Sequence, residues 1–169
     1  MDFNTFCTIL FDSLNITFKF GLDKYAIAEH LIDQYKNESW FDQQKIIFKF
    51  FSERSPPKYQ CIFLFGKFEE FDINMQDDAG NTVLILSARN YDSKKFVENM
   101  IGTINWLLTN YDYELSIVNN DGHGLCDYLI KSPHHREICA YKSLNNIIKT
   151  LPLSTQINFF GQDIFEYID

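Results

Sequence analysis

Three residues near the end of the chain have types and a spacing that could suit a zinc site: His134, His135 and Cys139. His135 and Cys139 are one helical turn apart, so both side chains would lie on one face of a helix. Cys126 or His123 could in principle complete the set of ligands. The ligand spacings of known zinc sites are absent, however. We therefore expect Cys139 in the core, both histidines in a solvated first turn, and no metal site.

Catalytic groups are equally sparse. Covalent catalysis needs a nucleophile beside a base, and acid–base catalysis needs paired carboxylates in a cleft. Cys7, Cys61 and Cys126 occupy apolar stretches, in which a thiol is inert. Acidic pairs such as Asp77 and Asp78 are adjacent in sequence, which does not place them around a substrate. The chain contains no GxxxxGK[ST], GxSxG or HExxH motif. We therefore expect neither an enzyme nor a bound cofactor.

Composition narrows the classes of partner. The 169-residue chain is long enough for one domain with its own core, and 46% of its residues are hydrophobic. Its net charge of -8 would be repelled by the phosphates of nucleic acid and by the headgroups of an anionic membrane. A basic protein surface is compatible with this charge. We expect a protein partner, with no nucleic acid and no membrane, and the oligomeric state stays open.

The cysteines and the N-terminal residues indicate a compartment. The four cysteines form no CxxC pair, which is typical of reduced thiols in a cytosolic compartment. No apolar run reaches the roughly 18 residues of a membrane span. Residues 1–4 lack the basic start of a secretory signal. We therefore expect a cytoplasmic protein, or one in the host cytosol if its source is a virus or an intracellular bacterium.

Apolar residues recur at three- and four-residue steps along most of the chain, which predicts helices rather than strands. Ser39 is a plausible N-cap, residues 55–57 are the clearest helix breaker, and Ser132 with Pro133 forms a helix start signal. The predicted helices span residues 2–14, 22–35, 39–51, 59–65, 82–89, 93–110, 125–131 and 133–149, with a last short helix compatible with 158–169.

Two polar loops between these helices resemble each other. Aligned on Gly80 and Gly122, residues 71–84 and 113–126 each carry an acid, an aliphatic residue and a small polar residue. A polar turn that ends in glycine follows in both. The order of short helix, turn, longer helix and polar loop therefore occurs at least twice.

This pattern resembles the ankyrin repeat family. The residues that carry the match are Asp72, Ile73, Asn74, Asp77, Gly80, Thr82, Leu84 and Ala88. The resemblance implies that each loop is a β-hairpin finger whose glycine supplies a turn conformation that a side chain would resist. It also implies that the threonine hydroxyl caps a short inner helix, and that the leucine and alanine pack between neighbouring repeats.

The chain departs from the family pattern in several places. Gly124 stands where the family has threonine, so the second copy loses that cap. Val83 and Ile85 replace the proline and histidine of the motif in the first copy. The spacing between Gly80 and Gly122 is 42 residues, against about 33 for an ankyrin unit. We place the additional residues in the long outer helix.

The predicted fold class is all-α: an ankyrin-like helical solenoid of about three divergent repeats. Residues 39–150 form the repeats and residues 151–169 a C-terminal capping segment. Residues 1–38 do not match the motif and form an N-terminal helical cap, because a repeat array needs terminal units with a polar outer face.

Ankyrin units carry no chemistry of their own, so the resemblance implies a protein-binding surface on the finger tips and the concave face. The residues expected to bind the partner are Asp77, Asp78, Asn81, Arg89, Trp106, Asn119, Asn120, Asp121 and His123. The finger residues have a second interpretation as good turn formers. Trp106 has a second interpretation as packing on an adjacent repeat, although tryptophan is favoured at binding hot spots. The finger tips together would present an acidic edge to a basic partner.

The source and the function have further hypotheses. Short divergent arrays of this kind are typical of viral and intracellular-bacterial effectors that bind or block a host factor. Richness in Asn, Lys, Ile, Phe and Tyr fits an AT-rich genome of such a source. The alternative function is a structural or regulatory subunit that self-associates or docks through the aromatic N-terminal helices.

Overall fold

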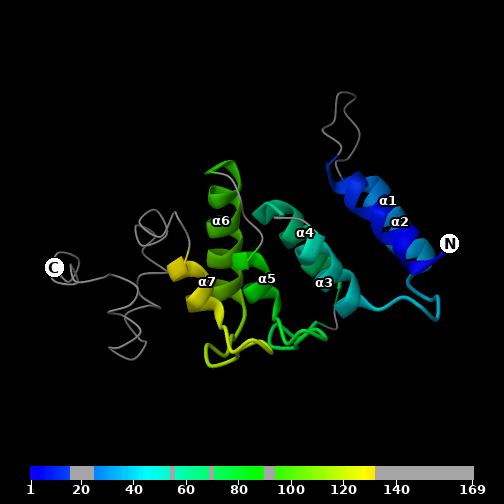
Figure 1. Cartoon of the computed structure of the whole chain (residues 1–169). Helices are drawn as coiled ribbons and strands as arrows, with labels where there is room; N and C mark the ends of the chain where they lie inside the picture. Colours follow the sequence, from blue (N-terminus) through cyan, green and yellow to red (C-terminus); the bar gives the residue numbers. More distant parts are fainter. Residues whose placement is uncertain (16–24, 54–55, 69–70, 90–93, 132–169) are drawn as a thin grey trace, which may run out of the picture.

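The structure is a computed structural model that describes residues 1–15, 25–53, 56–68, 71–89 and 94–131. Within these ranges the chain is all-α and forms no β-strand. The helices are α1 (Phe3–Asn15), α2 (Ala26–Tyr35), α3 (Gln43–Glu53), α4 (Lys58–Lys67), α5 (Val83–Arg89), α6 (Lys94–Asn110) and α7 (Leu125–Lys131) (Figure 1). The predicted helices after residue 131, the capping segment 151–169, and His134, His135 and Cys139 lie outside the described residues.

Helix pairs follow one another across the molecule (Figure 1). α1, α3, α5 and α7 contact each other in that order and form an inner row, while α4 contacts α6 in an outer row. α2 extends the outer row, because Tyr25 stacks on Phe63 of α4 with 4.3 Å between ring centroids and Glu29 forms an ion pair with Lys67. None of the helices in the described part of the chain has the length and apolar character needed to cross a membrane.

The inner helices recur at a nearly constant interval. They begin at Phe3, Gln43, Val83 and Leu125, so that successive starts are 40, 40 and 42 residues apart. Residues 1–38 carry no repeat motif, yet α1 and α2 form the same kind of inner and outer pair as α3 and α4. A helix pair therefore takes its place in the rows through its apolar faces, without a glycine-closed loop before it.

A side-chain acceptor caps three of the four inner helices. Asp2, Asp42 and Thr82 each accept the N–H three residues further on, at 3.0, 3.0 and 3.3 Å. Gly124 has no side chain, and Asp127 Oδ2 accepts the Gly124 N–H at 2.7 Å instead. These bonds satisfy backbone groups that the first turn of a helix leaves unpaired. The predicted cap at Thr82 is confirmed, and the loss of a cap at Gly124 is offset by the carboxylate one turn later.

The predicted start of α3 is wrong. Ser39 is exposed and lies in a turn, and the helix begins only at Gln43. Both residues satisfy the composition rule for a cap, but Asp42 adjoins the first residue that can bury its apolar neighbours in the inner row.

Aromatic rings fill the space between successive helix pairs. Phe11 of α1 and Phe50 of α3 are fully buried, with 4.9 Å between their ring centroids. Phe65 of α4 meets Trp106 of α6 edge to face at 5.5 Å. Each buried Phe contributes about 1.5–3 kcal/mol by leaving water, and an aromatic pair adds about 0.5–1.5 kcal/mol. The phenylalanine-rich composition is therefore used mainly to join one pair to the next.

We expect Asp42→Ala to lower the free energy of unfolding by about 1 kcal/mol, because it removes the acceptor for the first turn of α3. Ser39→Ala is the matched control and should change stability by less than about 0.5 kcal/mol. Urea denaturation followed by circular dichroism measures both. Equal effects of the two substitutions would show that Asp42 is not the cap.

Candidate functional site

Two loops project at the same end of the helix rows (Figure 1). We refer to residues 72–82 as the first finger and to residues 114–124 as the second finger. In the first finger, Gly80 N–H donates to Asp77 O at 2.8 Å and Asp77 N–H donates to Asn81 O at 2.9 Å. The bonds 42 residues later have lengths of 2.8 and 3.0 Å. The two fingers are therefore closed by the same backbone bonds.

Glycine is required at the closing position of each finger. Gly80 and Gly122 both have a φ of 77°, in the left-handed region that side chains disfavour. The first finger holds no β-bridge, and the second holds a single antiparallel one, between Val118 and Gly124. The fingers are thus tight turns that lead directly into α5 and α7.

One side chain organises the turn of each finger. Asp77 Oδ1 accepts the N–H groups two and four residues further on, at 3.0 and 2.8 Å. Asn119 Oδ1 stands in the equivalent place and accepts the corresponding groups at 3.1 and 2.9 Å. A carboxylate and an amide exchange freely here, because the turn requires only an acceptor oxygen.

The fingers are joined side by side. Asn120 N–H donates to Ala79 O at 3.0 Å, and Asn120 Nδ2 donates to Asp78 O at 3.1 Å. Gln76 Nε2 donates to Val118 O at 2.9 Å. These bonds connect the backbone of one finger to the next, so that the two loops form one continuous edge. Gln76 was not among the expected site residues, and no local sequence signal points to it.

Asn81 and Asn119 lie between the fingers rather than at their exposed tips. They are only 1% and 5% exposed. Asn119 Nδ2 donates to Asn81 Oδ1 at 3.0 Å and to Tyr128 Oη at 3.1 Å. Buried amides have to be paired within the protein, because water no longer reaches them. The expectation that both side chains bind a partner is therefore corrected: they hold the fingers together.

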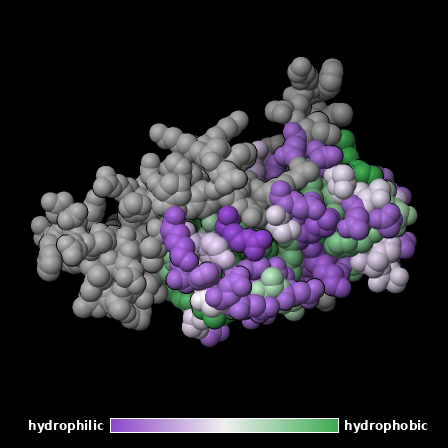
Figure 2. All heavy atoms as spheres, viewed as in Figure 1, coloured by the Kyte–Doolittle hydropathy of each residue, from purple (hydrophilic) through white to green (hydrophobic). Residues whose placement is uncertain are grey.

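The exposed tips form the candidate site. We define the finger edge as Asp78, Ala79, Asn120 and Asp121, all of which are exposed. Met75 and Val118, 47% and 48% exposed, add large apolar side chains to the same fingers. Figure 2 shows a mostly hydrophilic surface over the fingers, with a few hydrophobic side chains among the polar ones. This arrangement offers acidic, amide and apolar groups on one preorganised edge.

The other expected site residues are spread over different positions. Asp77 is half-buried and bonded within its own turn, and half-buried His123 Nε2 lies 3.1 Å from Lys131 Nζ. Arg89 is exposed at the end of α5, whereas the first finger precedes the start of that helix. Trp106 packs on Phe65 of the preceding helix pair, which was its second interpretation. The structure therefore brings neither Arg89 nor Trp106 to the finger edge.

The described thiols are poor nucleophiles. Burial raises the pKa of Cys7 and of Cys61 to about 12, and that of Cys126 to about 11. All three thiols are protonated at neutral pH, and a thiol reacts as its thiolate. Across the described ranges, no group of three or more His, Cys, Asp and Glu side chains is placed to hold a metal ion.

Comparison with known proteins adds no family. No protein-family model matches the chain, and no curated protein or solved structure matches it either. A functional proposal has to stand on the finger geometry and on the residues that the fingers expose.

We expect Gly80→Ala to destabilise the chain more than Gly122→Ala. Both substitutions place a side chain in the left-handed region, which costs about 1–2 kcal/mol. At Gly80 the new Cβ would also lie 2.6 Å from Asn120 Oδ1 and 2.8 Å from Asn120 N, whereas at Gly122 no atom of the described residues lies within 4 Å. The difference in unfolding free energy should therefore exceed about 1 kcal/mol. Equal losses in urea denaturation would contradict the close approach of the fingers.

We expect Asp77→Ala and Asp78→Ala to behave differently, although the two residues are adjacent. Asp77→Ala removes a charged acceptor of two backbone bonds and should lower the unfolding free energy by about 2 kcal/mol. Asp78→Ala leaves the Asp78 carbonyl that Asn120 uses and should change stability by less than about 0.5 kcal/mol. Thermal melting of both variants is the measurement. A stable Asp77→Ala protein would rule out its role in the turn.

Proposed function

We propose that the chain is an ankyrin-like repeat protein that binds another protein through the finger edge and catalyses no reaction. The observation that carries the proposal is the joining of two equivalent fingers into one edge. Its exposed side chains are held in place by backbone bonds, so a partner meets a surface that needs little ordering on binding. Exposed loops on a rigid scaffold are where binding residues concentrate in proteins.

The helix arrangement supports the repeat part of the proposal. Inner helices start 40, 40 and 42 residues apart, and each contacts the next one in the row. Contacts that run from each unit to its neighbour are typical of solenoid proteins, in which stacking buries a core that no unit could bury alone. The described part of the chain begins four such units, one more than the sequence motif predicts.

Charge supports a basic partner. Residues 68–131 carry eleven Asp or Glu against four Lys or Arg, a net charge of -7 out of the chain's -8. Asp78 and Asp121 add exposed carboxylates to the tips. A basic segment would be steered toward this side of the molecule, and the steering would weaken with salt. Met75 and Val118 would contact an apolar side chain within that segment. The host-factor hypothesis for the partner and the cytoplasmic location rest on the sequence alone.

A second candidate function has one observation in its favour. Met1 and Ile9 of the first helix pair are 49% and 39% exposed, and Ile27 of α2 is 46% exposed. These apolar side chains suit self-association through α1 and α2. A concentration-dependent dimer in light scattering, abolished by Ile9→Asp, would favour this function over the first.

A charge-reversal experiment tests the proposed function. Asp78→Lys with Asp121→Lys changes the finger edge, and Glu38→Lys with Glu98→Lys makes the same change in net charge at exposed positions elsewhere. We expect wild type and the control variant to capture the same protein from a lysate of the source or host. The finger variant should lose it by at least about tenfold, the scale of a single lost charge contact, with unchanged melting.

Equal capture by all three proteins would contradict binding at the finger edge. Loss of capture by the control variant as well would reduce the effect to net charge, and would count against a localised site.

A further inference from the structure

The middle of the chain has the opposite charge to the rest. Residues 36–67 carry six Lys or Arg against three Asp or Glu, a net charge of +3 in a chain of net charge -8. This stretch comprises the loop after α2 and the helix pair α3 and α4. It precedes the acidic finger region and differs from it in the ligands that its charge attracts.

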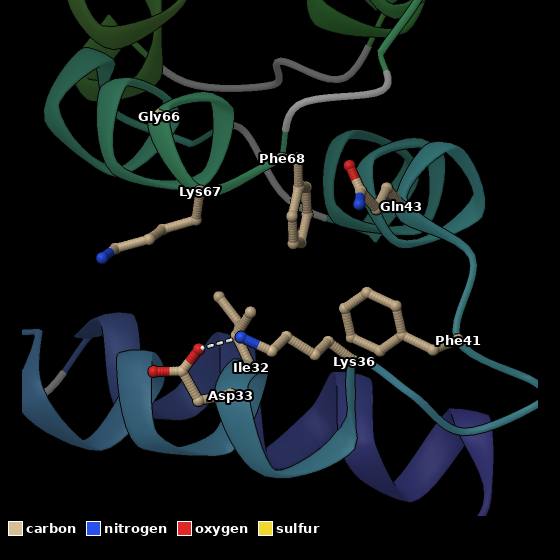
Figure 3. A pocket seen from close by; sticks show the side chains of 8 residues that line it. All are labelled: Ile32, Asp33, Lys36, Phe41, Gln43, Gly66, Lys67 and Phe68. Atoms are coloured by element: carbon tan, nitrogen blue, oxygen red, sulfur yellow. Dashed lines mark hydrogen bonds and ion pairs between the residues drawn. The ribbon is translucent and has the colours of Figure 1, made fainter.

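A cavity of about 510 Å³ opens within this basic stretch, between the end of α2, the start of α3 and the end of α4 (Figure 3). Its volume lies in the range of roughly 300–1,000 Å³ that is usual for small-molecule sites. Side chains from three helices and the loop before α3 line it. The cavity is separate from the finger edge, to which it contributes no residue.

One wall of the cavity is apolar. Phe41 and Phe68 meet edge to face with 6.1 Å between their ring centroids. Phe68 and Ile32 are only 4% and 5% exposed, so both are fixed in the core. Figure 3 shows Phe68 and Ile32 extending into the space between α4 and α2 from opposite sides. An aromatic ring or a branched aliphatic chain would find a preformed contact surface there.

The rim of the cavity is charged. Lys36 Nζ lies 2.9 Å from Asp33 Oδ1, and their side chains are 53% and 62% exposed. Lys67 forms an ion pair with Glu29, and their side chains are 36% and 43% exposed. Exposed ion pairs of this kind contribute little net stability. A carboxylate from a ligand could therefore replace Asp33 or Glu29 at small cost and would meet ammonium groups that already bind carboxylates.

We propose that this cavity binds a carboxylate carried on a large apolar group. The apolar group packs on Phe41 and Phe68, and the carboxylate binds Lys36 and Lys67. Two sources have this chemistry: a small aryl or alkyl carboxylate, and the C-terminal carboxylate of a peptide that ends in a large apolar residue. The proposal does not depend on the finger edge, and either proposal can fail alone.

Titration of the full chain tests the proposal. The probes are 3-phenylpropanoate and the peptide acetyl-Gly-Gly-Phe with a free carboxylate, each beside its uncharged amide, followed by calorimetry and by the backbone NMR shifts of Gly66 and Phe68. We expect saturable binding of the carboxylates, at least tenfold weaker binding of the amides, and shifts at both reporter residues. Tighter binding of the peptide assigns the site to a chain terminus, and tighter binding of the small acid assigns it to a metabolite.

Matched variants locate the binding. Lys36→Gln with Lys67→Gln should abolish it, whereas Lys45→Gln with Lys58→Gln, which removes the same charge from the same stretch, should leave it within about twofold. Asp33→Asn removes a competing carboxylate and should tighten binding of the acid. No saturable binding of either acid at millimolar concentration, equal binding of acid and amide, or retained binding in the Lys36 and Lys67 double variant would each overturn the proposal.

Discussion

The arrangement of the fingers depends on one close approach. The backbone N of Asn120 and its Oδ1 lie 2.8 and 2.6 Å from the point where a Cβ of residue 80 would stand. Only glycine leaves this space empty, and only glycine adopts the backbone conformation of that turn without strain. The bonds from Asn120 to Ala79 O and Asp78 O follow from this contact. The position of every exposed group on the finger edge therefore traces back to the missing side chain of Gly80.

The fingers are rigid because they continue into buried helices. All residues of α5 except Arg89 are buried, and α5 contacts α3, α6 and α7. Thr82 joins the first finger to this helix through its cap, and the Asp127 carboxylate does the same for the second finger and α7. A finger cannot move without disturbing a cap and a buried helix, so the edge behaves as a part of the core rather than as a loose loop.

The sequence predicted the features that are local. The helical ranges, the turn at Gly80 and the cap at Thr82 each follow from a few adjacent residues. Ser39 was taken as a cap because composition alone does not separate it from Asp42. Asn81 and Asn119 are 38 residues apart, and their mutual burial depends on the contact between fingers, which no local pattern encodes. The cavity between α2, α3 and α4 is likewise a product of packing, although the basic stretch that surrounds it could be read from the sequence.

Amide hydrogen exchange at Asn120 tests the joined fingers most directly. The side chain of Asn120 is exposed, but its N–H donates to Ala79 O of the other finger at 3.0 Å. If the fingers form one edge, this amide exchanges only with the opening of the surrounding core, with a protection close to that of the α5 amides. Exchange of Asn120 at the rate of an unprotected loop, while α5 stays protected, would show that the two fingers are independent.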